Sequence, residues 1–370
     1  MTRNGYFLRL AFSVVIDLFD FTLGRIPGFG TVTDGVVDNA EVVTGLMHRG
    51  AEKLFESRDY RQILSLANRH DWLSSFDGEL SAARVMEDAL GITVPPRARA
   101  LRTMISEVCR ISHHLYWLAE TLAALGVDTS ELRRARAEVT TALDRATGAR
   151  MHLMIVRIGG LALDIPDDWR TTLPHVDVAG YVDQAAGRLA GVATLTREQA
   201  VAYATSGVVA RASGWDRDLR DHLPHVVRTE GDALARMHCL ADEIEVSQQY
   251  VDALELPAGE IDTKLPRTIR LPEGEYYAAS ETGSGVNGWW LVSDGDVVPW
   301  RMKMRTASFN NAAALGACLP GTPVADLPAA LMSFLLVAGD MLELGAQSAL
   351  LHRELAEALA QNAGLTLHIE

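Results

Sequence analysis

The sequence has few cysteines, and their spacing excludes two kinds of site. Three occur in 370 residues, Cys109, Cys239 and Cys318, which lie 130 and 79 positions apart. This spacing fits neither a disulfide framework nor a CxxC metal site. A reducing cytoplasmic compartment is the natural interpretation, and the apolar or helical context of each cysteine favours a buried structural thiol.

Basic residues and long apolar runs are also in short supply. The chain has 34 Lys and Arg against 48 Asp and Glu, a formal net charge of −14. Because contacts with phosphate need concentrated Lys and Arg, this balance argues against nucleic acid as a partner. The apolar stretch 6–16 is interrupted by Arg9 and followed by Asp17, so it falls short of the ~18 residues of a membrane span. We therefore expect a soluble or peripheral protein.

Familiar catalytic motifs are missing as well. The chain contains no GxSxG elbow, no Walker A loop and no HExxH pair. The adjacent His113 and His114 lie in a predicted helix, where neighbouring side chains point about 100° apart and do not chelate one metal from one face. We expect one of the two to pack or hydrogen-bond inward, and we expect no metal on this chain.

Apolar periodicity predicts long helices. After Pro95-Pro96, apolar residues recur at helical spacing, and Gly126 can cap the C-terminus, which predicts a helix of about 28 residues. A second periodic stretch stops at Gly148, so the two helices would form an antiparallel pair, the start of a bundle. Further helices are expected over 177–191, 197–205 and 231–254.

Two segments have the composition of short strands. Residues 5–47 are rich in Val, Phe, Thr and Gly, with turn signals at Pro27-Gly28, Asp34-Gly35 and Asp38-Asn39. Between 256 and 303, runs rich in Tyr, Trp and Val indicate a second β region, with a hairpin turn predicted at Ser293–Asp296.

Together these patterns predict a fold that is mainly α with small β elements. After Pro328 the chain returns to helix, and Ala346–Glu370 contains an amphipathic helix that would cover a partner or the bundle. The expected divisions are an N-terminal β element at 1–47, a helical bundle core at 48–255, a small β region at 256–310 and a C-terminal helical segment at 311–370 that packs on the bundle.

Three clusters of charged residues are candidates for chemistry. The first, His48–Trp72, is dense in both charged and apolar side chains, and because a buried charge must be paired, it indicates a partner, a cofactor or a cluster. The second, Gly148–Gly160, combines basic residues with glycines that allow close backbone approach; a plain helix terminus with dipole-complementing basic residues is the alternative. The third, Ser206–Arg220, predicts either an irregular buried loop with paired ions or a surface loop.

In their order and their residue motifs, these clusters resemble the 49 kDa protein family of respiratory complex I. In bacteria, members of this family are the D-type component of NADH-quinone oxidoreductase. The resemblance covers roughly residues 44–340. It rests on the segments His48–Lys53, Val94–Ala98, Glu107–Leu115, Gly148–His152, Ser206–Val208, Arg211–Gly214 and Leu291–Gly295.

The resemblance implies a fold like the large subunit of nickel-iron hydrogenases, a helical bundle flanked by an N-terminal β hairpin and a C-terminal β region. A nickel-iron centre needs two CxxC pairs, which this sequence lacks. The resemblance also implies that Arg49 and His152 face an iron-sulfur cluster held by a neighbouring B-type subunit. A nearby cation stabilises the reduced cluster, and an imidazole can take up a proton as the electron arrives. The supporting residues would be His48, Glu52, Arg69 and Arg150.

The quinone-binding positions depart from the family. The family binds the quinone headgroup with a His in an N-terminal HPxxHG motif and with a Tyr in an LDY motif. The first histidine of this chain is His48, so the hairpin His is missing, and the LDY position reads His70-Asp71-Trp72. A family Asp on the long helix aligns with Ala124. Trp keeps an N–H donor but delivers no phenolic proton, so His70 is the candidate for partial compensation, with Asp71 orienting nearby groups.

Two function hypotheses follow. In the first, the chain is a peripheral subunit on the cytoplasmic side of the cell membrane, inactive alone, within an NADH-quinone oxidoreductase (translocase). It would help to pass electrons from a neighbour's iron-sulfur cluster to a quinone, with B-, C-, I- and H-type subunits as partners and no cofactor of its own. In the second, it is a divergent paralogue with a structural or assembly role. Arg49 and His152 favour the first hypothesis, whereas the missing His, Trp72 and Ala124 favour the second.

Overall fold

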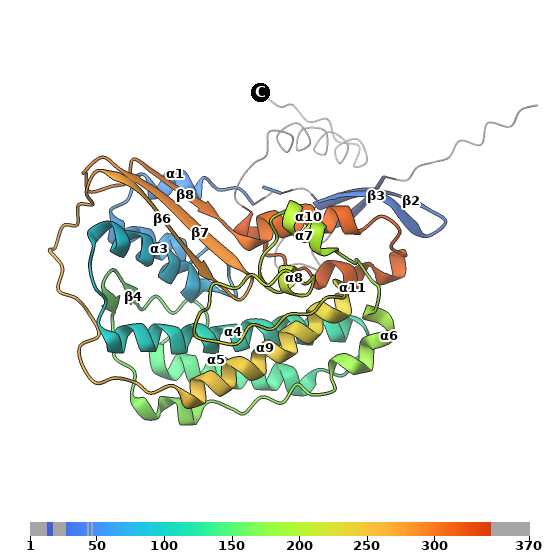
Figure 1. The fold of residues 1–370 in the computed structure, drawn as a ribbon, viewed down its shortest axis with the longest axis horizontal. Helices are drawn as coiled ribbons and strands as arrows, with labels where there is room; N and C mark the ends of the chain where they lie inside the picture. Colours follow the sequence, from blue (N-terminus) through green and yellow to red (C-terminus); the bar gives the residue numbers. More distant parts are fainter. Residues whose placement is uncertain (1–12, 18–26, 43, 46, 342–370) are drawn as a thin grey trace, which may run out of the picture.

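The computed structural model describes residues 13–17, 27–42, 44–45 and 47–341. Its centre is one long helix that packs against three others. These helices are α4 (Pro96–Ala124), α3 (Ser75–Leu90), α5 (Ser130–Thr147) and α9 (Ala233–Ala253). Helices α4, α5 and α9 lie side by side across the lower half of Figure 1, with the larger β elements above them. The predicted fold, mainly α with small β elements, is confirmed.

Local sequence explains where the two longest predicted helices begin and end. Pro96 occupies the first turn of α4, where its missing N–H costs no hydrogen bond. The helix spans 29 residues, and Gly126 follows its end with φ 87°, a left-handed conformation that glycine adopts freely. Helix α5 ends in the same way at Gly148, with φ 81°. Both predicted helices and both glycine stops are confirmed.

An N-terminal sheet of three antiparallel strands lies beside helix α10 (Figure 1). The strands are β1 (Ser13–Asp17), β2 (Pro27–Thr33) and β3 (Val36–Val42). The predicted turn at Asp34-Gly35 is confirmed, with φ 52° and 79°. The other two turn predictions are wrong, because Pro27-Gly28 begins β2 and Asp38-Asn39 lies inside β3. There the Asn39 side chain accepts the N–H of Thr31 at 3.2 Å, beside a shift in strand register.

A second antiparallel sheet packs on α3, at the upper left of Figure 1. Its strands are β6 (Gly274–Glu281), β7 (Val286–Ser293) and β8 (Arg301–Arg305). Its tight turn is Thr282–Gly285, where two backbone hydrogen bonds join the end residues. The hairpin predicted around Ser293–Asp296 is present, because β7 and β8 pair antiparallel on either side of it, but its connection is long, 294–300.

The other described elements are short. They are α1 (Ala51–Phe55), α2 (Tyr60–Ala67), β4 (Val156–Arg157), β5 (Gly160–Leu161), η2 (Asp167–Thr172), η3 (Val182–Ala185), α6 (Ala186–Leu189), α7 (Arg197–Ala202), α8 (Gly207–Arg211), α10 (Ala307–Cys318), η4 (Val324–Asp326), α11 (Leu327–Met332) and η5 (Ala338–Asp340). The helix predicted over 177–191 is wrong in extent, because Gly180 and Gly191 adopt left-handed φ values and leave one irregular helical stretch between them. The helix predicted within Ala346–Glu370 lies outside the described residues.

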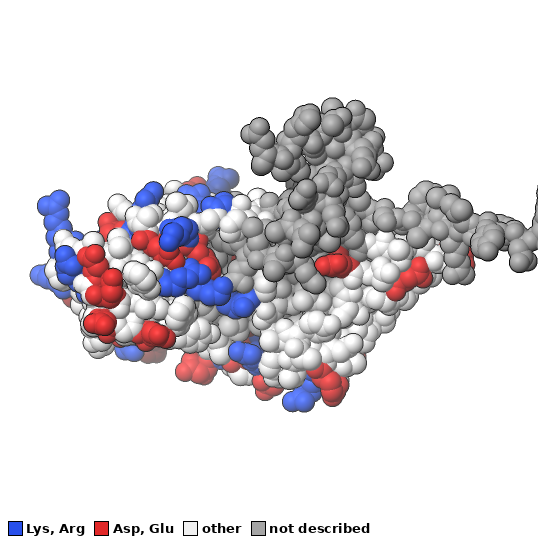
Figure 2. Space-filling model, turned by 90° about the horizontal axis from the view of Figure 1, so that it is seen from above, with Lys and Arg blue, Asp and Glu red and all other residues white. Residues whose placement is uncertain are grey.

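Core and surface agree with the composition. Cys109, Cys239 and Cys318 are buried free thiols, as predicted. Within the described ranges, no helix combines the length and the apolar character that crossing a membrane requires. Figure 2 shows that Lys and Arg alternate with Asp and Glu on the face seen from above, where both signs gather toward one end of the molecule.

Candidate functional site

The loop between α2 and α3, Asn68–Ser74, brings the two predicted cluster-facing residues together. The guanidinium of Arg49 donates to the backbone carbonyl of Arg69. His152 Nδ1 lies 2.5 Å from Oδ1 of Asn68, the preceding residue. Arg49 and His152 therefore meet at adjacent positions of one loop, although they are far apart in the sequence.

These residues form a partly exposed surface, which we call the Arg49–His152 surface and define as Arg49, Arg69, Met151, His152 and Met154. Arg49 is exposed, and Met151 and Met154 are 47% and 40% exposed. Burial, and then the charge of Arg69, lower the pKa of His152 below its ordinary value. A neutral imidazole among guanidiniums suits proton uptake when negative charge arrives nearby.

Glu79 on α3 supports this surface from below. Its carboxylate accepts the N–H of Met154 at 2.9 Å and of Val156 at 3.2 Å, and it also accepts the side-chain amide of Asn68. Burial raises the pKa of Glu79 to about 7. Glu79 therefore positions both the partner of His152 and the segment after it, a role that sequence reasoning missed.

The next loop residues, His70 and Asp71, turn into the interior. His70 Nδ1 lies 2.6 Å from Oδ1 of Asp340, and its Nε2 lies 3.3 Å from the Asn287 amide nitrogen. Asp71 accepts the backbone N–H groups of residues 73 and 74 with one oxygen, and its other oxygen lies 2.7 Å from the hydroxyl oxygen of Ser284. Burial, and then the charge of Asp340, raise the pKa of Asp71 to about 6.

Trp72, the third quinone candidate, is half-buried and packs against η5. A Cβ added to Gly339 would lie 2.3 Å from the carbonyl oxygen of His70 and 3.2 Å from Cε2 of Trp72. The close approach of η5 to the loop therefore requires glycine at this position.

A groove of about 990 Å³ borders the Arg49–His152 surface. Its lining includes Glu79, Met154 and Arg157, together with charged residues of the 262–267 segment. His70, Asp71 and Trp72 do not line this groove. The predicted quinone residues thus lie in a different place, against η5 and the turn between β6 and β7.

The residues predicted to support the cluster-facing site interact mainly with other residues of this chain. Glu52 pairs with Arg301 and accepts the N–H of Met304 at 3.0 Å, which ties α1 to β8. Arg150 pairs with Asp144 at 3.3 Å on the surface, and His48 is exposed. In the second predicted cluster, the glycines do allow a close approach, but to this chain itself: a Cβ on Gly160 would lie 2.0 Å from the carbonyl oxygen of residue 261.

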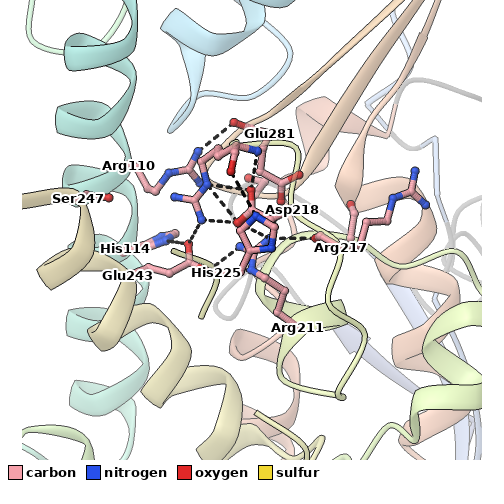
Figure 3. A network of polar contacts seen from close by, with 12 residues as sticks. Arg110, His114, Arg211, Arg217, Asp218, His225, Glu243, Ser247 and Glu281 are labelled. Atoms are coloured by element: carbon pink, nitrogen blue, oxygen red, sulfur yellow. Dashed lines mark hydrogen bonds and ion pairs between the residues drawn. The ribbon is translucent and has the colours of Figure 1, made fainter. Parts of the chain in front are cut away.

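The third predicted cluster combines the two alternatives. Residues 206–213, which include α8, and Arg220 are buried, with paired ions, whereas Asp216, Arg217 and Leu219 are exposed. Arg211, fully buried, pairs with Glu243 at 2.6 Å and with Glu281 at 2.7 Å. Arg220 joins Glu243 at 3.2 Å to Glu107 at 3.4 Å. Figure 3 shows labelled side chains that converge from five places in the fold: Arg110 from α4, Glu243 from α9, Arg211 from the end of α8, Asp218 from the loop after it and Glu281 from the end of β6. We call this group the ionic cluster; its members are Glu107, Arg110, Arg211, Asp218, Arg220, Glu243 and Glu281.

His113 and His114 both hydrogen-bond inside the protein, where the sequence predicted this for one of them. His113 Nε2 lies 3.0 Å from the hydroxyl of Ser284, and the two Nδ1 atoms lie 3.0 Å apart. His114 Nε2 lies 3.1 Å from Oε2 of Glu243. A continuous series of contacts, Asp71–Ser284–His113–His114–Glu243, therefore joins a quinone candidate to the ionic cluster. We call it the buried polar series.

Ser284 was missed in the sequence, although a signal was present. It lies in the glycine-rich stretch Gly283–Gly288, which covers part of the turn between β6 and β7 and the first residues of β7. A Cβ on Gly283 would lie 2.6 Å from Cγ of His113, so the glycine lets the turn approach α4. In the part of the chain that the structure describes, no group of His, Cys, Asp and Glu side chains is arranged to hold a metal ion.

Comparison with known proteins agrees with the resemblance seen in the sequence. Residues 128–267 and 263–341 match the profile of the family "Respiratory-chain NADH dehydrogenase, 49 Kd subunit". The D 2 subunit of NADH-quinone oxidoreductase from Salinispora tropica is 43% identical over 84% of this chain and 87% of the relative. The D 1 subunit from Streptomyces coelicolor is 42% identical over 84% and 89%, and the D subunit from Geobacillus thermodenitrificans is 35% identical over 83% and 91%. The chain therefore belongs to the family of the 49 kDa subunit of respiratory-chain NADH dehydrogenase and is a subunit of an oxidoreductase complex of the complex I type.

Proposed function

We propose that this chain helps to pass electrons from an iron-sulfur cluster in a neighbouring B-type subunit to a quinone at the membrane interface. The observation that carries the proposal is the loop 68–72, which contacts Arg49 and His152 at one end and contains Asp71 and Trp72 at the other. Five residues span at most about 18 Å. The two candidate sites are therefore neighbours within one rigidly bonded loop.

Each candidate has a role that its chemistry supports. The guanidinium of Arg49 would stabilise the reduced cluster, and the imidazole of His152 would take up a proton with the electron. Asp71, whose pKa is raised to about 6, would supply a proton to the reduced quinone where the family uses a tyrosine. Trp72 would offer an apolar face and an N–H donor.

The same proposal includes the location of the chain and the subunits that surround it. It would lie peripherally on the cytoplasmic side of the cell membrane, with B-, C-, I- and H-type subunits around it. It would hold no cofactor of its own and would be inactive outside the complex. NADH would be the ultimate donor of the electrons, and the quinone would be their acceptor.

A redox titration of the terminal iron-sulfur cluster in the purified complex tests the cluster-facing roles. Arg49→Ala should lower the midpoint potential, because a cation beside the reduced cluster is lost. His152→Ala should remove the pH dependence that the midpoint potential has near neutrality. Arg134→Ala is the control, since Arg134 pairs on the surface of α5 with Glu131, and it should change neither quantity.

If neither Arg49→Ala nor His152→Ala changes the midpoint potential or its pH dependence, the cluster-facing roles of these residues are wrong. If the complex also assembled through this chain but reduced no quinone, the structural or assembly role would be favoured, as Trp72 and Ala124 suggest by their departure from the family.

A further inference from the structure

The buried polar series has more contacts than its neutral groups have protons. Four contacts link its five groups, Asp71, Ser284, His113, His114 and Glu243, at 2.7, 3.0, 3.0 and 3.1 Å. Each hydrogen bond needs one proton. A serine hydroxyl and two neutral imidazoles supply three, so with both carboxylates ionised, two lone pairs would oppose each other at one contact. The series therefore holds one additional proton.

Of the two carboxyls that end the series, Asp71 is the one whose surroundings favour the additional proton. Burial lowers the pKa of both imidazoles, and Arg110 lowers both further, so neither carries a second proton readily. Burial opposes ionisation of Glu243, but Arg211 and then Arg220 outweigh it and hold its pKa well below the ordinary range. Asp71 has the opposite setting, since Asp340 adds to the effect of burial and raises its pKa.

Other charged groups also face the series. Arg136 faces His113, Arg220 faces His114, and His70 faces Asp71. Asp77, itself buried on α3, lies near enough to Asp71 for their charges to repel. Glu243 pairs directly with the guanidiniums of Arg211 and Arg220, whereas Asp71 has the carboxyls of Asp340 and Asp77 as neighbours. This difference sets the direction of the series.

With the proton on Asp71, every donor points toward Glu243. Asp71 donates to Ser284, Ser284 donates to His113 Nε2, His113 Nδ1–H donates to His114 Nδ1, and His114 Nε2–H donates to Glu243. If the proton is on Glu243 instead, the same four contacts are again hydrogen bonds, but in each of them the donor and the acceptor exchange roles. Because both nitrogens of each ring are already engaged, the two states interconvert without rotation of either imidazole.

We propose that Asp71, Ser284, His113, His114 and Glu243 form a proton relay between the quinone candidates and the ionic cluster. Four protons each cross one hydrogen bond, so each O–H or N–H bond that breaks is matched by one that forms. The net result is one proton moved from Glu243 to Asp71. This inference rests on the proposed function: reduction of a quinone takes two electrons from the cluster and two protons, and the relay would act once for each proton.

The ionic cluster is suited to supply the relay. Its four carboxylates, Glu107, Asp218, Glu243 and Glu281, outnumber its three guanidiniums, Arg110, Arg211 and Arg220, so one negative charge is left to accept a proton. Oε2 of Glu281 is buried and has no hydrogen-bond partner among the described residues. His222, whose side chain is 28% exposed, lies 3.5 Å from Glu107 and connects the cluster to solvent.

The test interrupts the series at two places in the assembled complex. Ser284→Ala removes a hydroxyl, and His113→Gln keeps a polar side chain that does not exchange protons between two ring nitrogens. Ser213→Ala is the matched control, because Ser213 is as buried as Ser284 and its hydroxyl also hydrogen-bonds inside the protein, to the backbone carbonyl of Val209 at 3.0 Å, outside the series and the ionic cluster. Quinone reduction by NADH is measured in H₂O and D₂O, and reduction of ferricyanide by NADH reports assembly.

Ser284→Ala and His113→Gln should each slow quinone reduction by about tenfold or more, within the range that positioned acids and bases contribute. Both should enlarge the solvent isotope effect and leave ferricyanide reduction unchanged, while Ser213→Ala should match the wild type. Wild-type rates and isotope effects in both test variants would overturn the relay. Should one variant fail to assemble, the other decides.

Asp71→Asn separates failure of the relay from failure of the proposed function. If Asp71→Asn slows quinone reduction and the two relay variants do not, the relay is wrong and the proposed function stands. If Asp71→Asn and Trp72→Ala both leave quinone reduction unchanged, the assigned quinone site is wrong, and the relay falls with it.

Discussion

At the scale of single residues, acids with raised pKa values gather around the site. Burial is the main cause in each case, and it raises the pKa of Asp71 to about 6 and those of Asp77 and Glu79 to about 7. Between the ordinary pKa near 4 and these values, the folded chain binds more protons than the unfolded chain. The contribution of these three acids to the free energy of unfolding therefore falls as the pH rises through about 4 to 7.

Asp77→Asn isolates one of these acids. Asp77 accepts the hydroxyl of Ser106, and its other oxygen has no partner among the described residues, so an amide resembles the protonated acid. At pH 8 the variant should exceed the wild type in free energy of unfolding by an amount on the order of a few kcal/mol. At pH 4 the two should be nearly equal. Urea unfolding of the full chain at both pH values checks this, and an equal difference at both would contradict it.

The ionic cluster predicts a large cost for removing one cation. Arg211→Leu leaves Glu243 and Glu281 buried without their main partner and should reduce the free energy of unfolding by about 3 to 5 kcal/mol. Arg134→Leu, which breaks pairs with Glu131 and Glu138 on the surface, should cost less than about 1 kcal/mol. Urea unfolding of both variants measures the contrast; similar costs would refute the structural role of Arg211.

At the scale of elements, prediction succeeded where the decisive interactions are local. Helices α4 and α5 follow from apolar periodicity and from stops at Gly126 and Gly148. The turn at Thr282–Gly285 was missed because the contact that determines it is with His113 of α4, which is far away in the sequence. Residues joined across the fold are equally hidden in the sequence, since hydrogen bonds such as His70 to Asp340 link positions 270 residues apart.

The candidate site was predicted in part, through resemblance rather than spacing. The family motifs indicated Arg49, His152 and the His70–Trp72 segment, and the structure places all of them on or against one loop. Neither periodicity nor composition identifies Glu79 or Ser284. Their roles arise from tertiary packing of α3 and of the turn between β6 and β7 against this loop.

The packing of η5 on this loop gives a test at the same scale. Gly339→Ala would place a methyl group against the His70 carbonyl, so η5 must shift, and the free energy of unfolding should fall by about 1 to 3 kcal/mol. Gly187→Ala is the control, because Gly187 lies in α6 with nothing within 4 Å of an added Cβ, and it should be neutral or slightly stabilising. Thermal unfolding compares them, and equal effects would contradict the close packing.

At the scale of the whole molecule, the helices differ in how deeply they are enclosed. Helix α4 packs against α3, α5, α9 and α11, whereas α5 buries one stripe, Leu132, Val139, Ala142 and Leu143. Amides within α4 should therefore exchange with deuterium only on global unfolding, and those on α5 should exchange earlier by local opening. Hydrogen exchange of the full chain followed by mass spectrometry tests this order; equal protection of the two helices would contradict it.

The turn between β6 and β7 has a consequence for how the protein is made. Arg110 donates to the carbonyl of Thr282, and His113 contacts Ser284, at sequence separations of 172 and 171 residues. A nascent chain that has completed α4 must therefore keep these polar side chains hydrated until the ribosome has added the turn. The central helix reaches its final dry environment late in synthesis, and a chain that stops before Thr282 leaves Arg110 and His113 without their partners in the turn.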